Sequence, residues 1–217
     1  MQESTLEYVK SAFGDRTLVV PRAWYLSPVE SEKAYINFTV NESGRTSFAH
    51  GLVGMQPDET RVTHIDQHLT AGRFFTDDDL NTVIIPDSLA ALVGIMPGDI
   101  GTATISLYGE DYEVIGIFDS AALTEVVDLD GETLTPVDTV KDAALINREN
   151  TEDPRTQASM TVETFNHLEV TNTLFLPYQR VINMNGRLRS IAVAADPDDK
   201  GFTQRVESFM SRVALTL

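Results

Sequence analysis

The stretch from Val83 to Phe118 constrains the fold most, because it combines a strand, a short helix, a tight turn and a hairpin. The apolar run from Val83 to Ile85 predicts a strand. Pro86 is expected to end that strand because proline has no N–H to donate. Asp87 is suited to cap the helix predicted over Ser88 to Val93.

This short helix is expected to bury Leu89, Leu92 and Val93 on one face, since they are three or four residues apart. Gly94 follows at the position where a left-handed residue ends a helix at the lowest cost. Nothing in this segment suggests catalysis. It therefore predicts a compact structural unit.

A turn is predicted at Pro97, Gly98 and Asp99, which lead into a strand pair. Pro97 fixes its own φ, and Gly98 is expected to adopt a positive φ. Gly98→Val should therefore lower thermal stability. The two strands predicted next are Thr102 to Leu107 and Tyr112 to Phe118, joined across residues 108–111.

The N-terminal residues predict a helix, in which Ser4 and Glu7 form a capping box and Gly14 marks the end. Its apolar face would contain Leu6, Val9 and Phe13. Three strands are expected to follow, over Thr17 to Val20, Tyr35 to Val40 and Thr46 to Val53. Asn41 to Gly44 would connect the last two strands as a hairpin.

The C-terminal residues predict a strand over Arg189 to Ala194, with Ile191 and Val193 facing inward, and a helix over Lys200 to Ala214. Carboxylates and a proline precede the helix at residues 196–199, where the helix dipole favours negative charge. The apolar stripe of this helix would contain Phe202, Val206, Phe209 and Val213. We expect the first and last helices to lie side by side, in one subdomain built from both termini.

The block from Gly72 to Phe118 resembles the extracytoplasmic domains of MacB-like and lipoprotein-release (FtsX-like) ABC transporter permeases. The resemblance extends to Gly54 to Asp58, which looks like the family's Gly-x-Asp-Pro turn with Gln56 in the acidic place. It also includes Leu69 to Phe75 and Leu174 to Tyr178. It touches most of the chain, but residues 119–170 match the family poorly.

The resemblance implies an α+β fold with two subdomains. A Porter-like subdomain would contain residues 1–68 and 187–217, and an inserted β-rich Sabre-like subdomain would contain residues 69–186, with an acidic loop at 121–170. The implied function is to transmit ATP-driven motion in a bacterial inner-membrane permease to a substrate or partner protein outside the membrane. ATP hydrolysis would reside in a cytoplasmic subunit or domain, the permease would pair with a second copy, and transmembrane helices would lie outside these residues.

Composition agrees with an extracytoplasmic domain and excludes several functions. Sixteen basic residues against 33 acidic ones give a net charge of −17, which argues against nucleic acid as a partner. The absence of Cys excludes thiol chemistry and is compatible with an oxidising compartment. No apolar run is long enough to span a bilayer, and residues 1–20 do not form a signal peptide.

Residues 121–170 carry eleven acidic and three basic side chains and would steer cationic partners. Residues 147–159 within them are a candidate mobile loop. Trp24 and Tyr25 follow a predicted strand. They could anchor a partner or close the core, and the sequence favours neither.

Three groups of residues suggest chemistry only weakly, so we expect no metal, no cofactor and no catalysis. His64 and His68 could share a metal ion on a helix with Asp66 between them, but a third ligand is not evident. Two acidic clusters, 77–79 and 128–132, lack the spacing of a calcium loop. In the first, Thr76 can cap a helix whose first turn holds the aspartates.

The sequence leaves open two alternatives to a transporter domain. One is a free-standing periplasmic binding module, which a sizeable apolar pocket between the subdomains would favour. The other, less favoured, is a carboxylate-based hydrolase, for which carboxylates with a raised pKa in a cleft would be the signature. The chain contains neither a nucleophile-elbow motif nor a phosphate-binding glycine motif.

Overall fold

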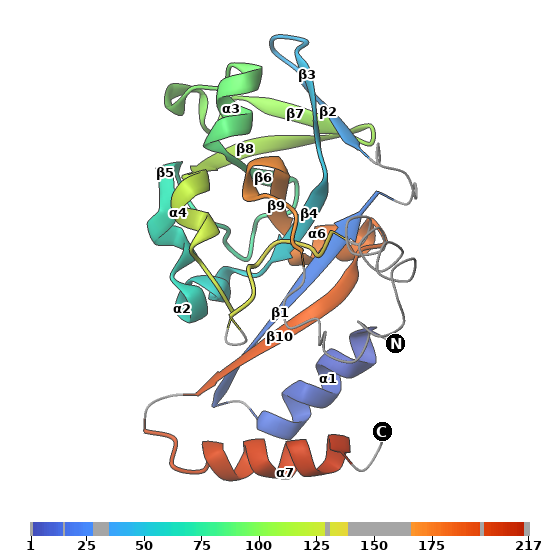
Figure 1. Ribbon diagram of the computed structural model, residues 1–217, viewed down its shortest axis with the longest axis vertical. Coiled ribbons are helices and arrows are strands. Elements are labelled where there is room, and N and C mark those ends of the chain that lie inside the picture. The colour runs from blue at the N-terminus through green and yellow to red at the C-terminus, as the bar shows by residue number, and fades with distance from the viewer. Residues whose placement is uncertain are drawn as a thin grey trace, which may run out of the picture.

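The computed structural model describes residues 2–14, 16–27, 35–128, 131–138, 166–195 and 198–214 (Figure 1). Ten strands in these residues form one mixed sheet. They are β1 Thr17–Leu26, β2 Ile36–Val40, β3 Thr46–Ala49, β4 Gly51–Met55, β5 Leu69–Gly72, β6 Thr82–Pro86, β7 Thr104–Leu107, β8 Glu110–Phe118, β9 Thr173–Pro177 and β10 Arg187–Ala195.

The described helices are mostly short, apart from one near each end of the chain. The α-helices are α1 Gln2–Phe13, α2 Thr60–Thr63, α3 Asp87–Val93, α4 Ser120–Thr124, α6 Tyr178–Asn183 and α7 Phe202–Ala214. The 3₁₀ helices are η1 Pro57–Glu59, η2 Ile65–His68, η3 Pro97–Asp99 and η4 Val170–Asn172. The chain is therefore an α+β protein, as predicted.

The strand order is β10-β1-β4-β9-β6-β8-β7-β2-β3, with β5 paired to β8. β4 pairs with β9 in parallel, as β6 does with β8, and the other pairs are antiparallel. All five residues of β4, β6 and β9 are buried. Such strands are covered on both faces, which explains their continuous apolar sequences.

Two core clusters lie on opposite faces of this sheet. Leu52 belongs to one cluster and Val53 to the other, and Leu174 and Phe175 divide in the same way. Successive side chains of a strand point to opposite faces, so this alternation assigns one cluster to each face. The sheet is thus the middle layer of the body.

The strand predicted over Thr46 to Val53 is interrupted at His50 and serves two places in the sheet. β3 pairs with β2 at one end of the strand order, whereas β4 pairs with β1 and β9 near the other end. The predicted hairpin between β2 and β3 is confirmed. The first strand, predicted to end at Val20, continues to Leu26 because β4 and β10 both pair with it.

Several local predictions were wrong. α1 begins at Gln2, so Ser4 lies inside the helix rather than at its N-cap, where the capping box was predicted. Leu92 is 68% exposed, and Ala90 is buried beside Leu89 and Val93 instead. Each helical residue rotates about 100°, which carries Leu92 past the edge of the buried arc. The Asp87 carboxylate bonds Ser88 N and Ser120 N, linking two helices rather than capping α3.

The turn after α3 also differs from its prediction. Gly94 lies at φ 76°, the left-handed conformation predicted for it. Residues 97–99 form η3, and Asp99 Oδ2 accepts from Met96 N at 2.8 Å. Gly98 does not have a positive φ, whereas Gly101, three residues later, has a φ of 81°. The expected positive φ at Gly98 is therefore wrong, because a 3₁₀ turn needs right-handed φ values.

The division between residues 1–68 with 187–217 and residues 69–186 stays a prediction. In Figure 1, α1 and α7 occupy the lower end, and the β1–β10 ribbon runs from there up into the sheet. The β2–β3 hairpin pairs with β7 at the opposite end of the molecule. Residues 147–159, the candidate mobile loop, lie outside the described residues.

Candidate functional site

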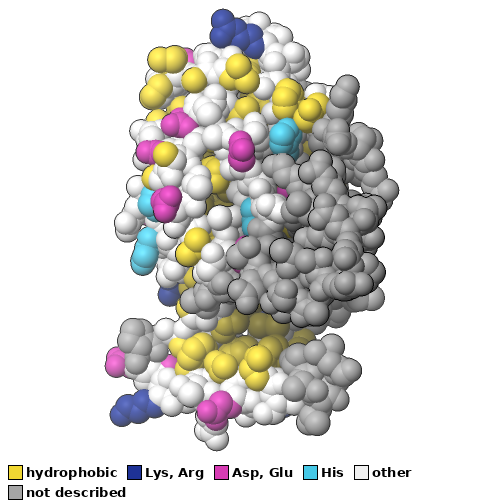
Figure 2. All heavy atoms as spheres, in the orientation of Figure 1, with side chains coloured by type: hydrophobic (Ala, Val, Ile, Leu, Met, Phe, Trp, Pro, Cys, Tyr) yellow, Lys and Arg dark blue, Asp and Glu magenta, His cyan; other side chains and the backbone are white. Residues whose placement is uncertain are grey.

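The helices α1 and α7 pack against each other at one end of the molecule, which confirms their predicted pairing (Figure 1). Ring centroids are 5.8 Å apart for Tyr8 and Phe209, 5.2 Å for Phe13 and Phe209, and 6.1 Å for Phe13 and Phe202. These contacts place the start of one helix beside the end of the other. The pair is thus antiparallel, and Figure 2 shows hydrophobic side chains gathered where it meets the body.

A two-stranded ribbon leads from this helix pair into the body. β1 and β10 are antiparallel from the Thr17–Ala195 pair to the Trp24–Arg187 pair, with a bulge between Arg22 and Ala23. The Arg205 guanidinium ties α7 to the start of the ribbon, because it bonds Asp199 and the Thr17 hydroxyl. The bond from Arg205 lowers the pKa of Asp199.

A buried arginine marks the point where the ribbon enters the sheet. Arg22 Nε and Nη2 donate to the two oxygens of Glu59, each at 2.9 Å, and Nη1 donates to Asp128. The side chains of Arg22 and Glu59 are 2% and 0% exposed. Burial alone would lower the pKa of Arg22, but its hydrogen bonds and charge attraction to Glu59 and Asp128 outweigh burial and raise it. The arginine is therefore a charged clamp between β1, η1 and residue 128.

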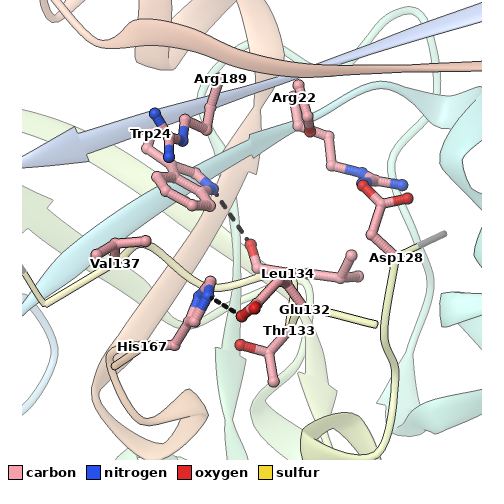
Figure 3. Close-up of a pocket in the computed structure, with 10 residues that line it drawn as sticks. Arg22, Trp24, Asp128, Glu132, Thr133, Leu134, Val137, His167 and Arg189 are labelled. Carbon is pink, nitrogen blue, oxygen red and sulfur yellow. Dashed lines mark hydrogen bonds and ion pairs between the residues drawn. The ribbon is translucent and has the colours of Figure 1, made fainter. Parts of the chain in front are cut away.

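A small pocket lies beside this clamp (Figure 3). Trp24 Nε1 donates to the Leu134 carbonyl at 3.2 Å, and the Arg189 guanidinium lies 4.9 Å from the Trp24 ring centroid. His167 Nε2 bonds Glu132 at 2.8 Å. The cavity volume is about 190 Å³, below the 300–1,000 Å³ typical of small-molecule sites. Arg22 is paired with Asp128 and His167 with Glu132, and Arg189 lies against Trp24, so these groups are engaged rather than arranged around an apolar space.

The two predicted contact residues therefore have different surroundings. Trp24 lines the pocket, whereas Tyr25 contacts Tyr108, with their hydroxyls 3.2 Å apart. Both lie within β1 rather than beyond its end, because the strand is longer than predicted. Gly94, Pro97, Gly98 and Asp99 lie at the turn after α3, away from the clamp and pocket.

The structure does not bring together the residues that the sequence offered as weak candidates for a metal site. His64, at φ 54°, separates α2 from η2, so the two histidines do not share a helix. Asp128 and Glu132 bond Arg22 and His167, and Asp130 lies outside the described residues. In the part of the chain that the structure describes, no three His, Asp or Glu side chains are grouped to hold a metal ion.

Residues 77–79 form a turn rather than the predicted first turn of a helix. Asp79 causes the difference, because it binds backwards along the chain: Arg73 donates to both of its oxygens, at 2.6 and 2.9 Å, and Thr76 N donates at 2.7 Å. These hydrogen bonds lower the pKa of Asp79 to about 2, and the bonds from Arg73 contribute most.

Asp79→Asn is expected to lower the free energy of unfolding at pH 7 by about 1–2 kcal/mol, allowing for solvent screening at the half-exposed Arg73. The depressed pKa stabilises the fold above pH 3.8, and this contribution is lost as the pH falls towards about 2. Urea unfolding of the parent protein and of Asp79→Asn at pH 7 and pH 2.5 measures this loss. The difference in free energy of unfolding between the two proteins should be smaller at pH 2.5. Asp78→Asn, at an exposed neighbour, is the control. An equal loss at both pH values would contradict the ion-pair explanation.

Sequence reasoning missed the Arg22–Glu59 pair. One available signal was the position of Arg22 in the apolar run from Leu18 to Leu26, where a charge needs a partner if the whole run is a strand. Ending the predicted strand at Val20 removed that signal. Nothing in the local sequence identifies Glu59, 37 residues away, as the partner.

Comparison with known proteins gives the family. The protein-family model described as the MacB-like periplasmic core domain matches residues 5–206 of this chain. The chain belongs to this family. It is accordingly a periplasmic or extracellular domain of a MacB-like ABC transporter permease. No curated protein matches. In the described residues, no helix has the length and apolar character needed to cross a membrane.

Two solved structures are similar to the chain. The periplasmic region of MacB from Actinobacillus actinomycetemcomitans matches with a TM-score of 0.55 and 14% identity, over 98% of this chain and 72% of that one. The extracellular domain of the noncanonic ABC-type transporter YknZ from Gram-positive bacteria gives a TM-score of 0.49 and 13% identity, over 94% and 78%. The likeness to the MacB region shows that the two share a fold.

Proposed function

We propose that this domain transmits ATP-driven motion from the membrane part of its transporter to a substrate or partner protein outside the membrane. The observation that carries the proposal is the antiparallel α1–α7 pair, which is joined to the sheet through the continuous β1–β10 ribbon. The six residues of β1 before β4 joins the sheet, Thr17 to Arg22, span about 20 Å. Displacement of the helix pair would therefore reach the body through one long two-stranded lever.

The buried clamp suits this role because it resists bending where the lever enters the body. Arg22 holds Glu59 through two parallel hydrogen bonds, a geometry with a fixed direction. The division into a Porter-like unit of residues 1–68 and 187–217 and a Sabre-like unit of residues 69–186 belongs to this proposal. The β2–β3 hairpin, although within 1–68, would belong to the second unit because it pairs with β7.

The proposed partners are a cytoplasmic ATPase subunit or domain, a second copy of the permease, and a protein outside the membrane. The net charge of −17 would favour an external partner with a cationic surface. Nucleic acid is disfavoured by the same charge. We propose that the domain itself is not an enzyme.

A hydrolase and a binding module receive less support. Hydrogen bonds lower the pKa of Glu42, of Asp79 and of Asp199, which is opposite to the raised pKa expected for a catalytic acid in a cleft. The pocket beside Trp24 is small, and two pairs of its polar lining side chains are bonded to each other. A ligand-capturing module would need a larger, more apolar space.

The proposal predicts rigid-body movement of the domain during ATP turnover. In the full-length transporter, one spin label at Ser208→Cys in each copy is expected to change its inter-copy distance between the ATP-bound and the nucleotide-free states. Two labels within one copy, at Ser208→Cys and Ser43→Cys, serve as the control and should keep their distance. Double electron–electron resonance spectroscopy measures both distances. Continued ATP hydrolysis and transport with an unchanged inter-copy distance would refute the proposed transmission.

A further inference from the structure

The hairpin between β7 and β8 is closed by an unusual residue. Tyr108 and Gly109 are the two turn residues, and their φ values are 52° and 81°. A two-residue turn with both φ values positive favours Asn, Asp or Gly at its first position. A bulky aromatic residue there is strained, and such strain persists only where other contacts hold it.

The contact that holds Tyr108 comes from the ribbon. Its hydroxyl lies 3.2 Å from that of Tyr25, and the two rings meet edge to face, with centroids 6.0 Å apart and an interplanar angle of 80°. Four strands separate β1 from β7 in the sheet order. The sheet must therefore curl to bring the end of this hairpin against β1, as Figure 1 shows.

A second contact reaches the same hairpin end from α6. Arg180 Nε donates to the Tyr112 hydroxyl at 2.7 Å, and Arg180 Nη2 lies 3.1 Å from a Glu110 oxygen. Helix α6 itself packs on β1 and β4. The first residues of β8 and the turn before them are thus held by β1, which is part of the ribbon, and by α6, which packs on β1.

We propose that Tyr108 is a positioning residue that braces the end of the β7–β8 hairpin against the β1 strand. The inference rests on the proposed function and deepens it, because it names a contact that links the ribbon directly to the β7–β8 hairpin, in addition to the path through the sheet. The side chain is 56% exposed. Burial is therefore a poor reason for an aromatic residue here, whereas the contact with Tyr25 is a specific one.

The test uses the 217-residue chain, which has no Cys and accepts labels at chosen sites. Spin labels at Ser208→Cys on α7 and Ser43→Cys in the β2–β3 turn report the distance between the two ends of the molecule. Tyr108→Asn places a favoured residue in the turn and removes the brace. We expect its Tm to stay equal or rise, while its distance distribution becomes broader than that of the parent protein.

Three further variants separate bracing from other effects. Tyr108→Phe keeps the ring contact and should restore a narrow distribution. Tyr25→Asn should broaden the distribution as Tyr108→Asn does, and the two together should add little. Leu92→Asn, at an exposed apolar residue on α3, is the control and should leave the width unchanged.

Two outcomes would overturn the inference. An unchanged width in Tyr108→Asn would show that the contact with Tyr25 positions nothing. A clear fall in its Tm would show that Tyr108 serves the stability of the hairpin instead. This measurement needs neither nucleotide nor a second copy of the chain. A negative result here therefore refutes the brace alone, whereas the proposed transmission is tested separately in the full-length transporter.

Discussion

Arg22→Met is expected to lower the free energy of unfolding by about 3–5 kcal/mol, because it leaves the Glu59 carboxylate buried without its cation. Glu59 is 0% exposed, and within the described residues its remaining side-chain hydrogen bond comes from the Thr63 hydroxyl at 3.0 Å. For a chain of this size the loss corresponds to a fall in Tm of about 10 °C. Thermal unfolding followed by circular dichroism measures it.

Two matched variants show whether the loss comes from the stranded carboxylate. Arg22→Met combined with Glu59→Gln should recover part of the stability, because the buried group is then neutral. Arg61→Met removes an ion pair with Asp58 whose side chains are 66% and 49% exposed, and should cost less than about 1 kcal/mol. Equal losses for Arg22→Met and Arg61→Met would contradict the assignment of a buried clamp.

Gly72→Ala is expected to destabilise the fold by at least about 3 kcal/mol, for two independent reasons. Gly72 has φ +80°, which strains any residue with a side chain. A Cβ atom there would also lie 2.0 Å from the Ile115 carbonyl oxygen and 2.7 Å from Gly116 Cα, both backbone atoms that cannot yield easily. The β5–β8 pairing would have to open.

Two other glycines provide a graded control for Gly72→Ala. Gly109 has φ +81° with open space around its Cβ position, so Gly109→Ala should cost about 1 kcal/mol from backbone strain alone. Gly98 has neither a positive φ nor a neighbour within 4 Å, and Gly98→Ala should change stability by less than about 0.5 kcal/mol. Guanidinium unfolding of the three variants measures the order. Similar losses at Gly72 and Gly109 would show that β5 moves away from β8 without much cost.

The elements predicted well are those specified by neighbouring residues. The β2–β3 hairpin is specified by its turn residues and the apolar runs on either side, and α1 and α7 are specified by apolar stripes of helical spacing. Gly94 ends α3 in the left-handed conformation expected of it. The block from Gly72 to Phe118 was also sufficient to indicate the family, because its motif combines several such local signals.

The errors arose where distant residues determine the local structure. Asp79 looked like part of a helix start but binds Arg73, and residues 46–53 read as one strand although β3 and β4 pair with different neighbours. A periodic pattern predicts that a segment is a strand, but it contains no information about which strand lies beside it.

The sequence by itself determined the fold class, the helices near the two ends and the membership of a transporter family, because each follows from local patterns. The tertiary structure decided that Arg22 is clamped by Glu59 and that Tyr25 contacts Tyr108. These pairs lie 37 and 83 residues apart in the chain. Their partners are selected by how the sheet is ordered and curled, since a buried charge or a strained turn is stabilised only by the groups that the fold brings to it.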